Sequence, residues 1–203
     1  MKLDENFDWN NYYKSKSNLV PRDSLLKALE FFDNEKIHRE HIANDIGCGH
    51  GADTLELLKR GWKVTAIDSS AQGLEILSAS VEPDWKNNLS TKLMSLEDIT
   101  LSKCTLLNAS YSLPFCKPEF FDGLWKKIEE SILTSGRFAG QFFGVNDSWA
   151  KDNPAMTFLE EENVRRFFQN FEIEFFHERD EDGTTATGDE KHWHVYSVIA
   201  KKV

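Results

Sequence analysis

The feature that most constrains the fold is a short apolar run that breaks into three alternating glycines, Gly47, Gly49 and Gly51. A strand that reverses directly into a helix needs residues that tolerate positive φ angles and let a ligand approach the main chain. The apolar residues 42–46 precede the glycines, and residues 54–60 behind them carry apolar side chains at helical spacing. The stretch therefore predicts a strand, a nucleotide-type binding turn and a helix.

A second strand completes this unit. The predicted helix stops at Gly61, and residues 62–67 have the composition of a strand that ends on Asp68. This acid follows the first glycine by about 20 residues, the distance at which such folds place a carboxylate on ribose hydroxyls. Strand, turn, helix, strand and acid together predict one nucleotide-binding unit.

Charge around the turn discriminates between two ligands. The spacing of Gly47, Gly49 and Ala52 also satisfies the dinucleotide fingerprint, so a nicotinamide cofactor is an alternative. A pyrophosphate is favoured by the positive end of a helix, yet Asp45 precedes this turn and Asp53 follows it. S-adenosylmethionine (SAM) has no phosphate and carries a sulfonium and an ammonium, which carboxylates attract. The turn therefore favours SAM.

The pattern Asp45-x-Gly47-x-Gly49-x-Gly51, followed by Asp68, resembles the first motif and the subsequent acid of class I SAM-dependent methyltransferases. The resemblance covers roughly residue 8 to the end of the chain. Together with the Leu-Pro-Phe after the fourth strand, the stretch is most similar to the tellurite-resistance-type (TehB-like) small-molecule methyltransferases. This family implies SAM as cofactor and a small molecule as methyl acceptor.

The rest of the chain alternates between helical and strand patterns. This favours an α/β fold, a Rossmann-like doubly wound, seven-stranded, mostly parallel sheet that ends in an antiparallel hairpin. We expect one domain over 1–203, with an N-terminal lid and helix in 1–35 and a Rossmann-like core in 41–203. Strands are predicted at 91–96, 105–107, 137–143, 171–176 and 193–199, and helices at 71–77, 119–133 and 160–168, with a turn at 133–136 and a polar loop at 180–191.

The composition and charge of the chain limit the classes of partner that it is expected to bind. With 34 acidic and 24 basic side chains the formal charge is −10, and no basic tract interrupts it, so neither nucleic acid nor an anionic membrane is an expected partner. No apolar run reaches transmembrane length and the first residues do not resemble a secretory signal, so we expect a cytoplasmic protein. Three cysteines without metal-ligand spacing suggest reduced thiols, and the pair His192 and His194 is too weak a pattern to predict a metal. The oligomeric state is open.

The resemblance implies which residues hold the cofactor. In similar enzymes an N-terminal tyrosine and a basic residue close on the methionine carboxylate, and the end of the third strand contacts adenine. Each of these places also has a simpler interpretation. Tyr13 and Arg22 are then an aromatic staple and an exposed surface arginine, and Cys48 packs beneath the ligand. The matching positions are Tyr13, Arg22, Asp45, Gly47, Cys48, Gly49, Asp53, Asp68, Ser69, Leu96, Glu97 and Asn108, with Asp98 an alternative to Glu97.

The methyl acceptor is expected after the fourth strand and at the loop that follows the fifth. Small polar residues beside aromatics suit this task, and the residues nominated there are Ser110, Tyr111, Phe115, Asp147 and Trp149. Asn108 is not followed by Pro-Pro and an aromatic, which disfavours an amide or nucleobase nitrogen as acceptor. Core packing of Tyr111 and Phe115 is the alternative.

No catalytic residue is assigned from the sequence. In-line attack on a sulfonium methyl needs chiefly positioning and exclusion of water, and a thiolate or a chalcogen oxyanion needs no general base. Folding could still bring His50, His192 or Asp147 to the acceptor as a base. The predicted function is methyl transfer from SAM to a small molecule, possibly a thiol or a chalcogen oxyanion. A SAM-binding protein that acts through a partner without turnover is the alternative.

Overall fold

The computed structural model describes residues 20–35, 40–185 and 188–203. In these ranges the elements follow the alternating order that the sequence predicts. The strands are β1 (Ile42–Ile46), β2 (Lys63–Asp68), β3 (Leu89–Leu93), β4 (Cys104–Ala109), β5 (Ile132–Gly144), β6 (Phe158–Leu159), β7 (Phe171–Thr184) and β8 (Glu190–Lys202). The helices are α2 (Asp23–Asn34), α3 (Ala52–Lys59), α4 (Ala71–Ser80), α5 (Pro118–Ser131) and α6 (Glu161–Phe167), with 3-10 turns η1 (Pro83–Asn88) and η2 (Leu113–Phe115). None of the described helices is long and apolar enough to span a membrane.

The strands form one sheet in the order β3-β2-β1-β4-β5-β8-β7, and the short strand β6 adds to β5. Strands β1 to β5 are parallel where they pair, whereas β8 is antiparallel to both β5 and β7. This confirms the predicted doubly wound sheet with its C-terminal hairpin. The chain runs outward from β1 to β3 and then returns to β4 beside β1, so the topological switch point lies between β1 and β4, where such sheets bind ligands.

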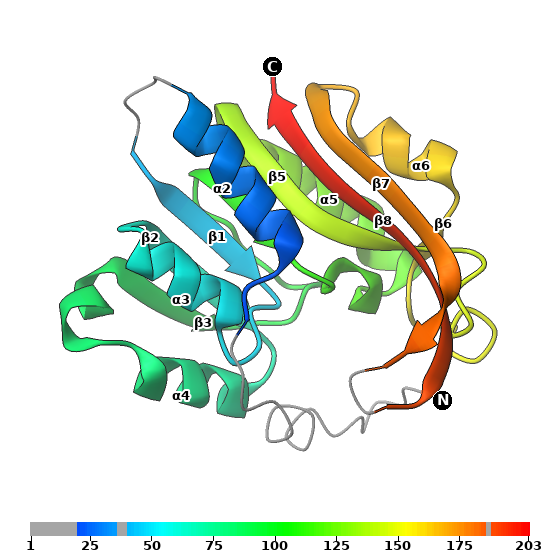
Figure 1. Ribbon diagram of the computed structural model, residues 1–203, viewed down its shortest axis with the longest axis horizontal. Helices are drawn as coiled ribbons and strands as arrows, with labels where there is room; N and C mark the ends of the chain where they lie inside the picture. The colour runs from blue at the N-terminus through cyan, green and yellow to red at the C-terminus, as the bar shows by residue number, and fades with distance from the viewer. Residues whose placement is uncertain (1–19, 36–39, 186–187) are drawn as a thin grey trace.

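Helices cover both faces of the sheet (Figure 1). Helices α2 and α3 lie on one face, where the core contains Leu25, Leu29, Leu57 and Leu58. Helices α5 and α6 lie on the other face, where an aromatic core forms around Trp125. Burial on both faces explains why β4, whose six residues are all buried, has no polar alternation in the sequence.

The helical spacing of Phe120, Leu124, Ile128 and Ile132 predicts one apolar stripe on the helix expected at 119–133, and the buried face of α5 differs from it by one position. Phe121, Leu124 and Ile128 face the core, whereas the predicted Phe120 is 46% exposed. Positions 121, 124 and 128 match the helical period, and residue 120 lies to one side of that stripe. Ile132, also predicted on this stripe, is the first residue of β5.

Two further boundaries were predicted wrongly. The expected turn at 133–136 lies inside β5, where Ser135 has a φ of +62° and the pairing with β4 shifts register. A single left-handed residue bends the strand there without ending it. The strand expected at 91–96 is β3, which begins and ends earlier, so residues 95–98 form a turn after it.

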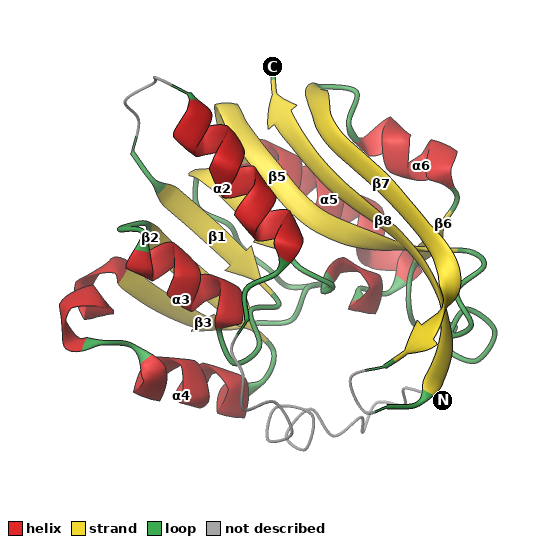
Figure 2. Cartoon of the chain, viewed as in Figure 1, coloured by secondary structure: helices red, strands yellow, loops and turns green. Residues whose placement is uncertain are grey.

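The expected polar loop at 180–191 is mostly hairpin. Strands β7 and β8 remain paired as far as Thr184 and Glu190, well beyond the neighbouring strand β5, as Figure 2 shows. Cross-strand contacts between histidines and carboxylates connect this extension, for example His192 with Asp182. Both faces of the ribbon are polar here, so the alternation that marks a half-buried strand is absent.

A buried ion-pair network holds β5 against the hairpin at the end of the sheet away from the glycine turn. Arg137 is almost fully buried and donates to both carboxylate oxygens of Glu174, at 2.6 and 2.7 Å. It also donates to Glu35 at 2.7 Å, as does Lys201. The bidentate geometry compensates for the cost of burying the guanidinium.

We expect Arg137→Met to lower the free energy of unfolding by about 3–5 kcal/mol, because it leaves Glu174 and Glu35 without their main partner. Urea unfolding of the wild type and the variant measures the effect. The matched control is Arg60→Met, which removes a more exposed pair with Glu56 and should cost less than about 1 kcal/mol. Equal losses in the two variants would contradict a structural role for the Arg137 network.

Candidate active site

The glycine turn has the backbone geometry that its sequence predicts. Gly47, Gly49 and Gly51 have φ values of +66°, +56° and +92°, a region that other residues rarely adopt. The amide of Gly47 donates to the carbonyl of Ile67 at 2.7 Å, which seats the turn on β2. A Cβ at Gly47 would lie 2.3 Å from the Cβ of Ser112, so close packing also demands glycine there.

Asp68 closes the turn from the end of β2. Its two carboxylate oxygens accept hydrogen bonds from the amides of Gly49, at 2.7 Å, and Ser70, at 2.8 Å. Burial raises the pKa of this carboxyl group. The carbonyl of Asp68 accepts from the amide of Met94 at 3.0 Å, which brings the turn after β3 next to it, and Ser69 beside it is exposed. Asp68 therefore connects the two loops predicted to contact ribose and adenine.

Three of the predicted residues meet at the switch point of the sheet. Asp45 on β1 and Asn108 on β4 are register partners, and both are buried. The carboxamide nitrogen of Asn108 donates to Asp45 and to Asp53, each at 2.9 Å. The Thr54 hydroxyl donates to the other oxygen of Asp45 at 2.5 Å. Asn108 thus connects β4 to two carboxylates that lie 63 and 55 residues earlier in the chain.

The described contacts of Asp45 are with side chains of the protein. One of its carboxylate oxygens accepts from Asn108 and the other from Thr54, so this carboxyl group supports the turn. Burial, and then the charge of Asp53, raise the pKa of Asp45 to about 7. A contact between Asp45 and the cofactor stays a prediction.

Arg22 lies between the turn and the predicted acceptor side. Its backbone amide donates to Asp53 at 2.8 Å, and its guanidinium carbon lies 5.1 Å from the centre of the Tyr111 ring. The side chain is exposed at the start of α2. A contact between Arg22 and the cofactor stays a prediction. Tyr13, its predicted companion, lies outside the described residues.

Cys48 occupies the middle of the turn. It is half-buried, and its sulfur makes only a weak 3.8 Å contact with the carbonyl of Gly49. Burial, with the charges of Asp45 and Asp68, raises the pKa of the thiol well above its ordinary value. A neutral thiol of this kind is a packing group rather than a nucleophile.

The predicted adenine contacts lie in the turn after β3. Leu96 and Glu97 are half-buried, and Leu96 packs against the aromatic core. Asp98 accepts a hydrogen bond from the hydroxyl of Ser95 at 3.1 Å, so its carboxylate already has a partner within the turn. Leu96 and Glu97 therefore remain the predicted adenine residues.

Tyr111 begins the acceptor side, directly after β4. Its φ of +55° is unusual for a bulky residue, and its amide donates to the Gln141 side chain at 3.0 Å. The amide nitrogen of Gln141 in turn donates to Ser24 at 2.8 Å, while Ser110 donates to Asn108 at 3.4 Å. The strained residue is therefore held from β5 and α2.

Four aromatic side chains form what we term the acceptor wall: Tyr111, Phe143, Trp149 and Trp193. Ring centres of Tyr111 lie 6.3 Å from Phe143 and 6.5 Å from Trp193, and the two indoles lie 5.8 Å apart. Phe115 packs against the same cluster. The structure thus brings the predicted Tyr111, Phe115 and Trp149 together.

The hairpin residues of this side are not predicted from the sequence. Trp193 belongs to the wall, and the guanidinium carbon of Arg179 lies 5.0 Å from the centre of the Trp193 ring. Asp147, predicted as a pocket residue, is buried in an ion pair with Lys191. A tryptophan in a hairpin and a lysine in a polar run carry no periodic signal, so only the fold could identify them.

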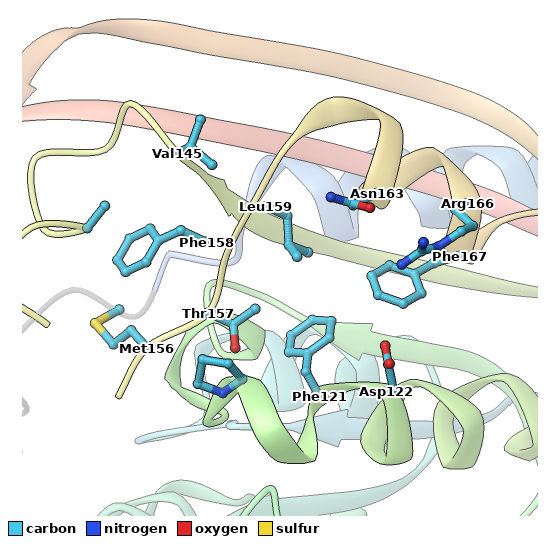
Figure 3. A pocket seen from close by; sticks show the side chains of 12 residues that line it. Phe121, Asp122, Val145, Met156, Thr157, Phe158, Leu159, Asn163, Arg166 and Phe167 are labelled. Atoms are coloured by element: carbon cyan, nitrogen blue, oxygen red, sulfur yellow. The ribbon is translucent and has the colours of Figure 1, made fainter. Parts of the chain in front are cut away.

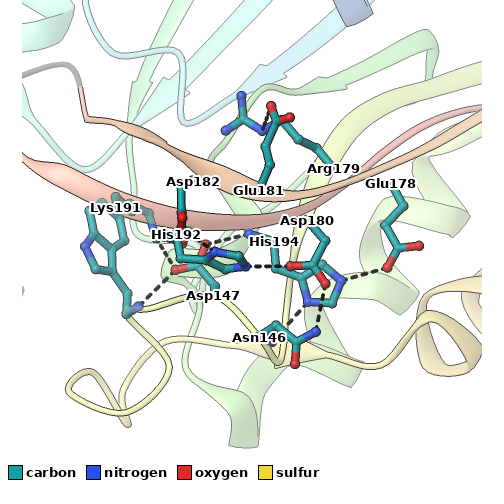
Figure 4. Close-up of polar contacts among 11 residues, drawn as sticks. Asn146, Asp147, Glu178, Arg179, Asp180, Glu181, Asp182, Lys191, His192 and His194 are labelled. Carbon is teal, nitrogen blue, oxygen red and sulfur yellow. Dashed lines mark hydrogen bonds and ion pairs between the residues drawn. The ribbon is translucent and has the colours of Figure 1, made fainter.

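Histidines and carboxylates gather on the hairpin beside this wall, as Figure 4 shows. Glu178, Asp180 and His194 place three potential metal-ligand atoms within 4.8 Å of one another. However, the amide of Asn146 donates to Nδ1 of His194 at 3.0 Å, so Nε2 carries the proton and donates to Glu178 at 2.9 Å. This tautomer leaves no lone pair on Nε2 for a metal.

His192 is also engaged. Its two ring nitrogens each lie 2.7 Å from a carboxylate oxygen, Nδ1 from Asp182 and Nε2 from Asp180. These hydrogen bonds raise the pKa of His192, and the one with Asp182 has the largest effect. Both nitrogens are donors in an imidazolium, which suits this arrangement. Neither His192 nor Asp147 is therefore available as a general base in this arrangement.

A separate pocket of about 360 Å³ lies between α5, α6 and the segment around β6 (Figure 3). Phe121, Phe158 and Phe167 line it, and Asp122 and Arg166 also face it. None of the residues predicted for cofactor or acceptor lines this pocket. It is therefore distinct from the site around the glycine turn.

Solved structures place this fold in a known class. TehB from Haemophilus influenzae has a TM-score of 0.74 and 16% identity, covering 96% of this chain and 67% of its own. A SAM-dependent methyltransferase from Methanosarcina mazei has a TM-score of 0.63 and 18% identity, covering 85% of this chain and 97% of its own. The 1,6-didemethyltoxoflavin-N1-methyltransferase of Burkholderia thailandensis was solved with 1,6-didemethyltoxoflavin and S-adenosylhomocysteine. It has a TM-score of 0.68 and 15% identity, covering 97% of this chain and 83% of its own. The fold is that of class I SAM-dependent methyltransferases.

A family model identifies the family within this class. The model described as tellurite resistance protein TehB matches residues 6–192. The chain therefore belongs to the TehB family, which confirms the resemblance found in the sequence. A comparison with curated protein sequences gives no significant match.

The raised pKa of Asp45 predicts a specific dependence of stability on pH. Because the pKa rises from 3.8 to about 7 on folding, the contribution of this group to stability is full below pH 4 and is lost as the pH rises through 7. Urea unfolding at pH 5 and 7.5 should show that the wild type loses at least about 1 kcal/mol more than Asp45→Asn over this range. Parallel pH profiles would show that Asp45 is not protonated in the folded protein.

Proposed function

We propose that this protein binds SAM at the carboxyl ends of β1, β2 and β4 and transfers its methyl group to a small-molecule acceptor. The carboxylates of the glycine turn carry this proposal. Among the described residues, Asp53 and Asp68 are hydrogen-bonded to backbone amides and a carboxamide, and no lysine or arginine side chain neutralises them. Such a turn favours a sulfonium and an ammonium over a pyrophosphate.

The residues present fit this cofactor. When bound, SAM supplies a methyl group on a positively charged sulfur that is open to in-line attack. Asp68 lies where ribose hydroxyls are expected, and the glycines of the turn allow the ligand to approach the backbone. Leu96 and Glu97, half-buried in the turn after β3, are the residues that we expect to contact adenine. Titration calorimetry with SAM and NAD in parallel tests the choice, since binding of NAD alone would overturn the assignment.

The acceptor side favours a nucleophile that needs no deprotonation by the protein. Asp147 is paired with Lys191, and His192 is held by two carboxylates, so two of the three candidate bases are engaged. Arg22 over Tyr111 and Arg179 over Trp193 add positive charge beside the aromatic wall. This combination supports a thiolate or a chalcogen oxyanion as the acceptor.

Transfer of a labelled methyl group from SAM to a panel of thiols, amines, selenite and tellurite tests the activity. We expect label on the thiols or oxyanions and none on the amines. A protein that binds SAM tightly but labels no acceptor would instead support a SAM-binding protein without turnover. Transfer to amines alone would overturn the proposed acceptor class while leaving the methyltransferase assignment in place.

We expect Asp68→Ala to weaken SAM binding at least tenfold, about 1.4 kcal/mol, because it removes both a ribose acceptor and the hydrogen bond that shapes Gly49. Calorimetric dissociation constants measure this. The matched control is Asp84→Ala, which makes the same change at an exposed position on η1 and should bind SAM as the wild type does. An unchanged dissociation constant for Asp68→Ala would remove this residue from the site.

A further inference from the structure

The ammonium group of Lys191 lies inside the aromatic cluster of the acceptor side. Its Nζ atom lies 4.1 Å from the ring centre of Trp149, 4.5 Å from that of Trp193 and 5.6 Å from that of Phe143. Its side chain is 1% exposed, and it is paired with Asp147, whose side chain is fully buried. Three rings and a carboxylate form the kind of site that recognises an ammonium ion, and here the chain's own lysine occupies it.

Asp147 connects this lysine to the loop after β5. Its Oδ1 atom accepts from the amide of Trp149 at 3.0 Å as well as from Lys191, and its Oδ2 atom accepts from the amide of His194 at 3.3 Å. The amide of Ser148 donates to the carbonyl of His192 at 3.1 Å and adds a second connection. The loop and β8 are thus joined by a buried ion pair together with hydrogen bonds from main-chain amides.

The same pair fixes two rings of the acceptor wall. Trp149 lies on the joined loop and Trp193 on β8, and Lys191 contacts both of them. Trp193 in turn contacts Tyr111, which follows β4 beside the cofactor turn. A change in the ion pair therefore alters the surface that an acceptor meets, while the turn that holds SAM is built from other residues.

We propose that Lys191 and Asp147 are a positioning pair that sets acceptor specificity: they hold Trp149 and Trp193 in place, and they fill the cage that would otherwise accept an ammonium group. The inference rests on the proposed methyltransferase function. It assigns the acceptor wall to neutral or anionic acceptors, because an external cation would have to displace a buried and paired lysine. Neither residue acts as a catalytic group in this proposal.

The test uses Lys191→Ala, which empties the cage and leaves Asp147 without its partner. We expect the KM for the acceptor to rise by about tenfold or more, while the SAM dissociation constant stays within about twofold of the wild type. Adding n-butylammonium should restore much of the acceptor KM and shift the tryptophan fluorescence. The double variant Lys191→Ala/Asp147→Asn should show neither response, because the carboxylate that binds the amine is gone.

Two further variants separate positioning from general stability. Lys191→Arg keeps the charge and should retain a KM close to that of the wild type. Lys201→Ala removes an ion-paired lysine at the other end of β8, where it contacts Glu35 at 2.7 Å, and should leave both KM and the response to amine unchanged. If Lys191→Ala weakens SAM binding and lowers kcat together, with no response to amine, the pair is merely structural and the inference is wrong.

The outcomes distinguish this inference from the proposed function. If the wild type methylates its acceptor and Lys191→Ala does so with an unchanged KM, the inference alone is overturned. If the wild type transfers no label to any acceptor, the proposed function fails and the specificity role fails with it. Recovery of the tryptophan signal by n-butylammonium would in that case still show that Lys191 fills an ammonium cage.

Discussion

Both amide hydrogens of Asn108 are donated to carboxylates, one to Asp45 and one to Asp53, and the candidate site depends on this carboxamide. It connects β4 to β1 at the switch point and connects both to the first turn of α3. Because the side chain is fully buried, loss of either hydrogen bond would leave a carboxylate oxygen without this donor in a dry environment. Asp53 extends the connection to the amide of Arg22, where α2 begins. The hydrogen bonds of Asn108 and Asp53 therefore link two strands and two helices at the switch point.

The sequence predicts the glycine turn and Asp68 well because both are local. Positive φ at Gly47, Gly49 and Gly51 is needed whatever surrounds the turn, and Asp68 follows at the end of the adjacent strand. The environment of Asp45 could not be predicted in the same way. Its partner Asn108 is 63 residues away, and only the pairing of β1 with β4 makes them neighbours. A carboxyl group that the sequence suggested for attracting a cation therefore also supports the turn from within the core.

The sequence is least informative on the acceptor side, where the structure is built from a hairpin and a loop. Hydrophobic periodicity reports the burial of apolar side chains, whereas the extension of β7 and β8 beyond the sheet buries polar ones, Lys191 and His194. Cross-strand pairs such as His192 with Asp182 stabilise it instead, and these have no sequence period. Lys191 is the extreme case, because its carboxylate partner and its three rings come from the end of β5, the loop after it and β8. A buried lysine in a polar run reads as a surface residue until the fold is known.

The contrast between the two sides of the site has a consequence for catalysis. In the proposed reaction, the turn supplies carboxylates to a sulfonium, and Arg22 and Arg179 place guanidinium groups at the rim of the acceptor wall. In a transfer from a sulfonium to an anion, both charges diminish as the methyl group moves, so strongly polar surroundings stabilise the reactants more than the transition state. In the proposed reaction, aromatic rings beside the transferred methyl group, with the charged groups at the rim, avoid this penalty and exclude water. An ammonium group left free within the wall would oppose that arrangement, and the pairing of Lys191 with Asp147 removes it.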